Sequence, residues 1–180
     1  MTCIVAIKKN KKIYIGGDSC GSNGHNFAAY PRKKVFKKGD FIYGCTTSYR
    51  MIDLLEYVFT PPARKVGYNP AEYMRADFIP ALRECFKNNA FSEINNSVEK
   101  GGVFLVGFDG FLFSIQADYS VLEAPEYGAA IGSGGEAATA ILFHLKDKKH
   151  IAEYMVNSAL SAAAGTIVSV REPFFIERLD

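Results

Sequence analysis

Apolar residues fall along the chain in short blocks, some continuous or alternating and others spaced three or four positions apart. The first kind predicts strands, because successive side chains of a strand point to opposite faces of a sheet. Strands are expected at residues 2–7, 13–17, 33–36, 41–45, 103–108, 111–115, 167–171 and 174–179. Asp109-Gly110 is typical of the two-residue type I′ turn of a hairpin. The last two strands are expected to form a closing hairpin.

The second kind of block predicts helices. After Thr46-Thr47-Ser48, apolar residues recur at helical spacing and indicate a helix that ends near Phe59, before two prolines. Asn69-Pro70 provides a cap and a first-turn proline for a second helix, which Pro80 is expected to kink or divide. Two further helices are expected, one after Gly135 and one over residues 148–164.

The order of these elements predicts the fold class. Strands, two helices, strands, two helices and final strands follow one another, with polar loops at residues 19–26 and 88–102. The strands 103–108 and 111–115 are apolar on consecutive residues, so both of their faces must be covered. The expected fold is α+β, with two stacked, mainly antiparallel sheets and a helix layer outside each. A length of 180 residues suits one domain, 1–180.

Composition narrows the class of protein. The chain is 48% hydrophobic and 22% charged, as in ordinary soluble domains, and no apolar run reaches the roughly 20 residues of a membrane helix. Four cysteines lie apart without a CxxC pair, and the three histidines have no ligand spacing. We therefore expect free, mostly buried thiols in a reducing cytoplasm, with no metal and no cofactor.

Charge is distributed unevenly. Residues 1–40 hold nine Lys or Arg and two Asp, while the whole chain has a net charge of only +2. The lysines come in pairs, mostly at expected hairpin turns, and no aromatic stacking residues lie between them. This pattern favours solvated turns over a nucleic-acid surface.

A strand that begins at residue 2 is unusual, because chain termini are usually frayed. Such a strand would hold the N-terminus in a fixed place. Once Met1 is removed, Thr2 carries a hydroxyl and a free α-amine on one residue, which is a nucleophile with its own base. The alternative is that Thr2 is an ordinary β-branched strand residue, and this segment alone leaves both readings open.

Four motifs in order along the chain carry a family resemblance: Thr2, Gly17-Asp18-Ser19, Arg32-Lys33-Lys34-Val35 and Ile131-Gly132-Ser133-Gly134-Gly135. They resemble the proteasome β-subunit family of N-terminal nucleophile (Ntn) hydrolases, and the last motif resembles its bacterial HslV branch. The resemblance runs the length of the chain. It implies a four-layer αββα sandwich.

The resemblance also implies catalytic roles. Thr2 would attack a peptide carbonyl, with its α-amine, whose ordinary pKa is about 7.7–8.0, as general base. Lys34 would lower the proton affinity of that amine, and Asp18 would pair with Lys34. Ser133 would assist proton transfer, and the backbone N–H of Ser48 would stabilise the oxyanion.

By the same resemblance, Ser22 would pair with the backbone of the substrate. The positions that match the family's specificity pocket are Gly21, Arg32, Thr46 and Arg50. Their two arginines indicate a polar or acidic residue before the cleaved bond.

Two positions depart from the family pattern. Ser48 stands where the family usually has glycine, so a side chain would narrow the cleft or change the loop. Thr166 stands where the family has an aspartate, although Ser169, three residues later, matches. A threonine hydroxyl there is able to hydrogen-bond Thr2 but supplies no charge.

The function implied by the resemblance is a threonine-type endopeptidase that acts on polypeptides inside a homo-oligomeric ring. An ATP-dependent unfoldase partner is expected, with no nucleic-acid or membrane partner. Two alternatives remain. One is a ring-forming structural protein without catalysis, which Thr166 and a retained Met1 would favour. The other is an Ntn amidase that acts on a small molecule.

Overall fold

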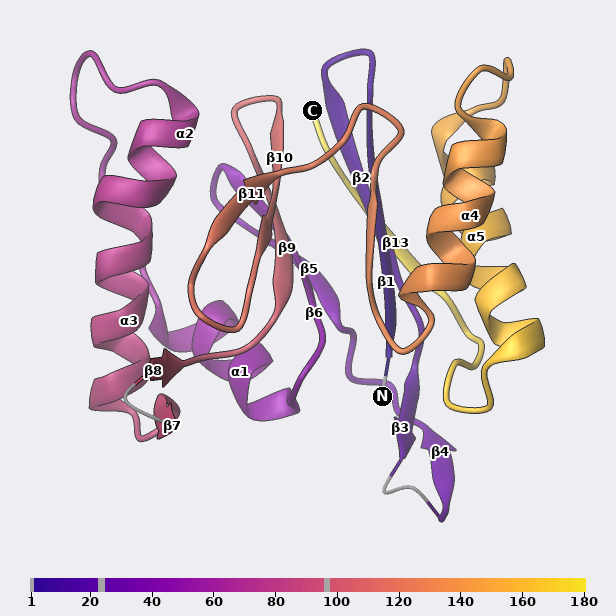
Figure 1. The fold of residues 1–180 in the computed structure, drawn as a ribbon, viewed down its shortest axis with the longest axis horizontal. Helices are drawn as coiled ribbons and strands as arrows, with labels where there is room; N and C mark the ends of the chain where they lie inside the picture. Colours follow the sequence, from indigo (N-terminus) through magenta and orange to yellow (C-terminus); the bar gives the residue numbers. More distant parts are fainter. Residues whose placement is uncertain (1, 23–24, 96–97) are drawn as a thin grey trace.

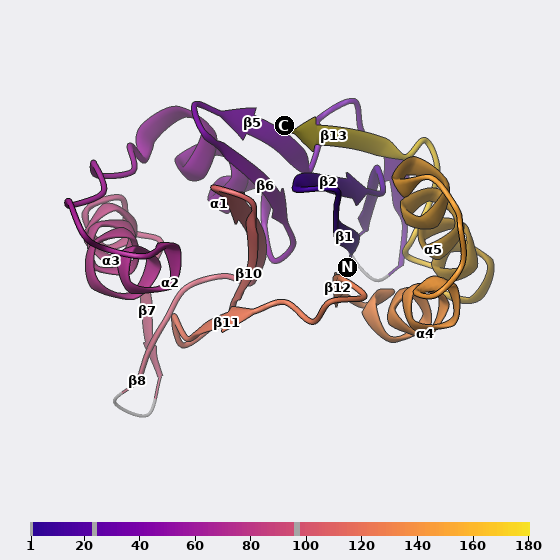
Figure 2. The same cartoon turned by 90° about the horizontal axis from the view of Figure 1, so that it is seen from above.

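In the computed structural model, which describes residues 2–22, 25–95 and 98–180, two β-sheets lie face to face between two layers of helices (Figures 1 and 2). Helices α1, α2 and α3 cover one side of the sandwich and α4 and α5 cover the other. The expected αββα architecture is confirmed. No helix in these described ranges is long and apolar enough to cross a membrane.

The first sheet carries the start of the chain. Its order is β12 (Ala129–Gly132), β1 (Cys3–Lys9), β2 (Lys12–Gly17) and β13 (Phe175–Leu179), and every pair is antiparallel. Asn10 and Lys11 join β1 to β2 with φ values of +53° and +64°, the left-handed conformation of a type I′ turn. The two expected N-terminal strands are therefore confirmed.

The second sheet has the order β11 (Val121–Glu123), β10 (Phe111–Ile115), β9 (Phe104–Phe108), β6 (Phe41–Cys45) and β5 (Val35–Lys38). Asp109 and Gly110 have φ values of +50° and +73°, which confirms the type I′ hairpin between β9 and β10. All of β9 is buried, as its continuous apolar sequence predicts. One face packs on the first sheet and the other on helices.

The helices over the second sheet contain widened turns. α1 (Tyr49–Asp53) continues into a π-helical segment, Leu54–Val58, and α2 (Pro70–Tyr73) passes through a second one, Met74–Phe78, into α3 (Ile79–Asn88). Asn69 and Glu72 form a capping box at the start of α2, as the cap predicts. Pro80 lies two residues after the end of the second π-helical segment, and the Ile79 N–H between them donates to the carbonyl of Met74. The wider turn accommodates a residue that has no N–H to donate.

A cluster of aromatic rings fills the space between this sheet and its helices. Phe41 stacks on Phe108 with ring centroids 4.5 Å apart, and Phe59 meets Phe78 edge to face at 5.1 Å. Stacked and edge-to-face pairs are favourable arrangements of aromatic quadrupoles. The cluster fixes the helix layer to the sheet.

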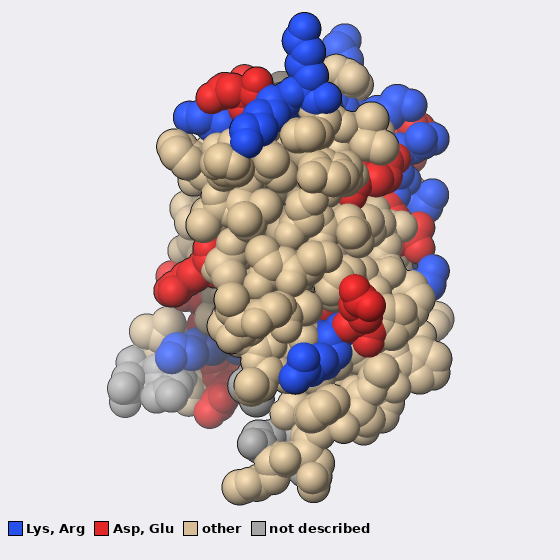
Figure 3. Space-filling view, turned by 90° about the vertical axis from the view of Figure 1, so that its right-hand side faces the viewer, with Lys and Arg blue, Asp and Glu red and all other residues tan. Residues whose placement is uncertain are grey.

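The helices over the first sheet are α4 (Gly135–Leu145) and α5 (Ala152–Thr166). α5 begins four residues later than expected, after Ile151 in extended conformation. Small side chains let α5 approach the sheet closely, and Ala159 and Ala163 are fully buried. On the outer face of this layer, charged side chains gather toward the edges and the middle carries few of them (Figure 3).

Several expectations were wrong. The expected loops contain two-stranded ribbons, β3 (Cys20–Ser22) with β4 (Phe27–Ala29) and β7 (Glu93–Asn95) with β8 (Val98–Lys100). Residues 23–24 and 96–97 of those loops lie outside the described residues. Residues 167–171 form no strand, so β13 pairs with β2 instead of closing a hairpin. The strands in these pairings do not alternate apolar and polar residues, so the sequence pattern did not reveal them.

The cysteines give a first prediction. Cys3, Cys20 and Cys45 are buried, whereas Cys85 is half-buried. Burial, reinforced by the nearby negative charge of Asp18, raises the pKa of the Cys3 thiol from 9.0 to about 12. Burial also raises the pKa of Cys45. At pH 8 both thiols are therefore protonated as well as covered. We expect iodoacetamide to modify Cys85 well before Cys3 or Cys45, as measured by peptide mass spectrometry over time.

The same alkylation in urea is the control, because unfolding should expose all the thiols equally. Equal rates for Cys3 and Cys85 in the native protein would contradict the prediction.

The raised pKa of Cys3 has a further consequence for stability. The Cys3 thiol makes its full contribution to the free energy of unfolding below about pH 9. This contribution is lost as the pH rises toward 12, because the thiol ionises in the unfolded chain before it ionises in the folded protein.

Candidate active site

Thr2, Asp18 and Lys34 meet at one end of the sandwich. Thr2 directly precedes β1, Asp18 directly follows β2, and Lys34 directly precedes β5 of the other sheet. The β1–β2 register holds the first two together, and the Asp18 N–H donates to the carbonyl of Cys3 at 3.2 Å. The site therefore bridges the two sheets at the start of the chain.

Asp18 is a fully buried carboxylate with several donors around it. It accepts hydrogen bonds from the backbone N–H of Cys3 and of Cys20, each at 2.9 Å. The ammonium of Lys34, itself only 3% exposed, donates to the same carboxylate at 2.9 Å. A buried charge is tolerated when it is paired and hydrogen-bonded in this way.

Lys34 has two further acceptors. Its Nζ donates to Thr2 Oγ1 at 2.9 Å and to the carbonyl of Cys20 at 2.6 Å. The three N–H groups of the ammonium thus have three acceptors, and one of them is the Thr2 hydroxyl. A positive charge at this distance stabilises negative charge on Oγ1.

Two serines lie on the other side of Thr2. The Thr2 nitrogen donates to Ser133 Oγ at 3.2 Å, and Ser133 Oγ lies 3.2 Å from the Thr2 carbonyl oxygen. Ser133 Oγ also lies 3.2 Å from Ser169 Oγ, and Ser169 is buried. The Gly134 N–H donates to the Thr2 carbonyl at 3.3 Å. A hydroxyl chain therefore runs from the Thr2 nitrogen into the interior.

A small cavity of about 120 Å³ opens beside the Thr2 hydroxyl. Its lining includes Lys34, Thr46 and Ser48. Ser48 caps α1, because its Oγ accepts from the Met51 N–H at 3.2 Å. Within the described ranges, the backbone N–H of Ser48 has no hydrogen-bond partner. The Ser48 hydroxyl is thus used by the helix, while its N–H is available to a ligand.

The loop before Ser48 is held by side chains. Thr47 has a φ of +55°, unusual for a β-branched residue, and its Oγ1 accepts from the Val103 N–H at 3.0 Å. Thr46 Oγ1 donates to the Val103 carbonyl at 2.7 Å. These bonds continue the β6–β9 pairing by one residue and fix the wall of the cavity.

Thr166 does not join this cluster. It is the last residue of α5, is exposed, and its hydroxyl donates to the carbonyl of Ala162 at 3.0 Å. Threonine side chains commonly bond back to the preceding helical turn in this manner. No hydrogen bond joins Thr166 to Thr2 among the described residues, so the expected contact between these two hydroxyls was wrong.

The expected substrate-binding positions do not all lie in one cavity. Gly21 and Thr46, expected in the specificity pocket, line the small cavity, and so does Ser22, expected to pair with the substrate backbone. Arg32 lines a larger cavity next to it, but its guanidinium is held by two carboxylates. Arg50 is exposed and lines neither cavity.

Two residues at the site were missed by sequence reasoning. Tyr49 lines both cavities and Tyr30 lines the larger one. The sequence did offer a signal for both residues. Tyr49 directly follows the expected oxyanion residue Ser48, and Tyr30 stands two residues before the expected pocket residue Arg32.

Two stacked antiparallel sheets between two helix layers form the αββα sandwich typical of the Ntn-hydrolase fold. No family model matches the sequence. Solved structures do match. BPH from Thiobacillus denitrificans has a TM-score of 0.80 at 20% identity and covers 100% of this chain and 99% of its own. The same protein is also known in complex with Epoxomicin.

Two other structures have the same fold. Eukaryotic HslV from Trypanosoma brucei has a TM-score of 0.72 at 23% identity and covers 99% of both chains. An Anbu (Gly-1) mutant from Hyphomicrobium sp. strain MC1 has a TM-score of 0.68 at 17% identity and covers 100% of this chain and 84% of that one. The chain therefore has the HslV-like, proteasome-like fold that the sequence resemblance implied.

Proposed function

We propose that this protein is a threonine-type peptidase whose nucleophile is Thr2 after removal of Met1. The observation that carries the proposal is the position of Lys34. Its ammonium lies 2.9 Å from Thr2 Oγ1 and 2.9 Å from Asp18, inside the sandwich. A buried lysine beside a threonine hydroxyl at the start of the chain suits the activation of that hydroxyl.

The reaction would proceed through an acyl-enzyme. Thr2 Oγ attacks the peptide carbonyl while its proton passes to the α-amine, and Lys34 stabilises the negative charge on Oγ. The tetrahedral intermediate collapses, the C–N bond breaks and the leaving amine takes the proton back from the α-ammonium. Water, deprotonated by the same α-amine, then hydrolyses the ester to release the acid.

Two groups support these steps. Ser48 lines the small cavity beside Thr2, and its backbone N–H would donate to the oxyanion. Ser133 Oγ, 3.2 Å from the Thr2 nitrogen, would relay protons to and from the α-amine. Ser22, on β3, would pair with the backbone of an extended substrate.

We further propose a homo-oligomeric ring in the cytoplasm, fed by an ATP-dependent unfoldase. The similarity to HslV supports this assembly. The outer helix layer also exposes large apolar side chains, among them Phe143, Ile151 and Tyr154, which favours a contact surface there. A particle several times the mass of one chain by native mass spectrometry is expected, whereas a small-molecule amidase would be a monomer or dimer.

A ring protein without catalysis is the second candidate. It is favoured by Thr166, because an uncharged and outward-turned residue stands where the resemblance expects an aspartate. With threonine at position 166, Asp18 is the only carboxylate bonded to the Lys34 ammonium within the described residues.

The deciding experiment is the intact mass of the purified protein before and after treatment with epoxomicin. We expect a mass without Met1 and a single adduct, with no adduct on a Thr2→Ala variant. A retained methionine together with no adduct would overturn the peptidase proposal and leave the non-catalytic ring protein.

The two C-terminal site positions give a second prediction. Thr166→Ala should change the rate of epoxomicin labelling by less than about twofold, because its hydroxyl bonds only to its own helix. Ser169→Ala removes the partner of Ser133 and should slow labelling by about tenfold, the effect of one hydrogen bond. Adduct formation over time by intact mass measures both rates. A larger loss in Thr166→Ala than in Ser169→Ala would contradict this assignment.

A further inference from the structure

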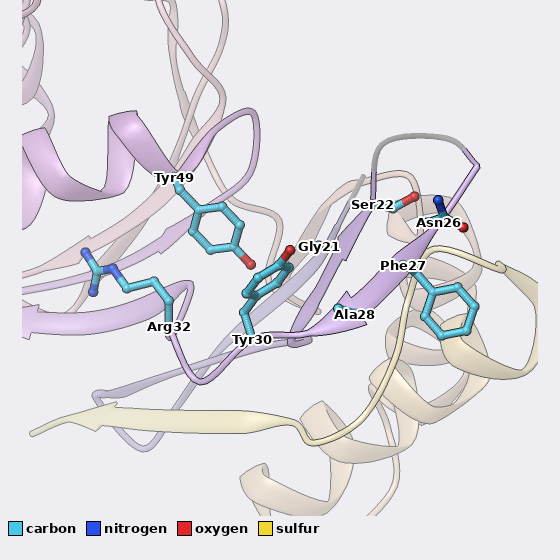
Figure 4. A pocket seen from close by; sticks show the side chains of 8 residues that line it. All are labelled: Gly21, Ser22, Asn26, Phe27, Ala28, Tyr30, Arg32 and Tyr49. Carbon is cyan, nitrogen blue, oxygen red and sulfur yellow. The ribbon is translucent and has the colours of Figure 1, made fainter.

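A cavity of about 550 Å³ adjoins the small cavity at Thr2 (Figure 4). The two share Gly21, Ser22 and Tyr49, so a chain bound at Thr2 passes the larger one. The other side chains that line it come from the β3–β4 ribbon and the segment after it: Asn26, Phe27, Ala28, Tyr30 and Arg32.

The walls of this cavity are mainly apolar, and three aromatic side chains belong to them: Phe27, Tyr30 and Tyr49. Tyr30 and Tyr49 meet edge to face with ring centroids 5.9 Å apart. Tyr30 also covers Gly21, where an added Cβ would lie 2.3 Å from the tyrosine ring, so the ring needs the glycine beneath it. Phe27 is 61% exposed and stands at the far side of the cavity (Figure 4). An exposed aromatic beside a cavity is available to a ligand.

The arginine of the lining is already neutralised. The Arg32 guanidinium lies 2.9 Å from Asp53 and 2.5 Å from Glu56, and 5.4 Å from the ring centroid of Tyr57. In Figure 4 its side chain extends away from Phe27. Two carboxylates on one guanidinium leave no positive charge at that wall for an acidic ligand.

Arg171 is a cation that contacts the Phe27 ring from outside the lining. Its guanidinium carbon lies 5.1 Å from the Phe27 ring centroid, it does not line the cavity, and it forms no ion pair within the described ranges. Among the described residues that line the cavity, Arg32 alone is charged, and its two carboxylate partners already neutralise it. The cavity therefore offers a ligand aromatic surface rather than a net charge.

We propose that this cavity selects a large uncharged side chain, preferably aromatic, on the peptide bound at Thr2, and that Asp53 and Glu56 set this selectivity by holding Arg32. The inference rests on the proposed peptidase function. It replaces the acidic preference expected from the arginines in the sequence.

Binding to the Thr2→Ala variant tests the inference without any need for catalysis. Blocked hexapeptides would carry phenylalanine or glutamate at each of the three residues before the bond to be cleaved, one position at a time. At one of these positions phenylalanine should bind on the order of tenfold more tightly than glutamate, as expected for burying an aromatic side chain. Titration calorimetry measures the affinities.

Two sets of variants, built on Thr2→Ala, test which residues set the preference for phenylalanine over glutamate. Asp53→Asn with Glu56→Gln releases Arg32 and should shift the preference at least about tenfold toward glutamate. Asp109→Asn is the matched control, because it removes a carboxylate from another arginine pair, Arg64–Asp109, remote from this cavity, and should leave the preference unchanged. Tyr30→Ala removes aromatic wall and should weaken phenylalanine binding while leaving glutamate binding unchanged.

The outcomes separate the two proposals. If no peptide binds and the wild-type protein forms no epoxomicin adduct, the peptidase function fails. If the wild-type protein forms the epoxomicin adduct and peptides bind but glutamate is preferred, the function stands and the inference is overturned, with Arg171 as the cation responsible. An unchanged preference in the Asp53→Asn, Glu56→Gln variant, folded as judged by thermal melting, would overturn the role of these two carboxylates.

Discussion

Replacing Lys34 with methionine is expected to lower the free energy of unfolding by about 3–5 kcal/mol, the usual cost of breaking a buried ion pair from one side. The loss arises because Asp18, fully buried, would be left without its cation and with only two backbone N–H donors. The same variant should lose epoxomicin labelling altogether, because Thr2 Oγ1 loses its neighbouring cation. Urea unfolding and intact mass measure the two effects.

A double-mutant cycle separates the ion pair from the packing of the lysine chain. Asp18→Asn combined with Lys34→Met leaves no unpaired charge, so the double variant should be more stable than Lys34→Met alone. Lys12→Met is the control, since its pair with Asp180 has side chains 42% and 62% exposed and such surface pairs contribute little to stability. Equal losses for Lys34→Met and Lys12→Met would show that Asp18 gains little from its buried partner.

The local features of the fold were the ones that the sequence predicted well. The Asp109-Gly110 turn and the Asn69 cap depend on neighbouring residues, and both occur as expected. Strand β12 and the partner of β13 depend instead on pairing with β1 and β2, more than a hundred residues away. Short segments without apolar alternation give no local sign of such pairing.

The candidate site shows the same difference between features that the sequence predicted and features that depend on distant contacts. The resemblance brought Thr2, Asp18, Lys34 and Ser133 together, because their motifs end or begin strands of a known arrangement. It did not predict the state of Arg32. That state depends on Asp53 and Glu56, whose spacing of three residues places both on one side of a helix, and on how that helix faces the β5 segment. A charge matched by position is therefore a weaker guide to specificity than its partners in space.

The second large effect is expected at Gly132, next to Ser133. Gly132 has a φ of +89° and pairs with Cys3, and a Cβ there would lie 2.2 Å from the carbonyl oxygen of Thr2. Because that neighbour is backbone, Gly132→Ala must move Thr2 itself. A displacement of about 1 Å at a reacting group costs about a hundredfold in rate, so we expect at least that loss in epoxomicin labelling.

Gly67→Ala is the matched control for this variant. Gly67 has a φ of +90°, nearly the same strained conformation for alanine, but no atom lies within 4 Å of its added Cβ. It should therefore cost about 1 kcal/mol of stability from the backbone conformation and leave the labelling rate unchanged. If Gly132→Ala were labelled as fast as Gly67→Ala, the position of Thr2 would not depend on the close approach of β12. If it were slow while unfolding within about 1 kcal/mol of Gly67→Ala, the effect would belong to the nucleophile rather than to the fold.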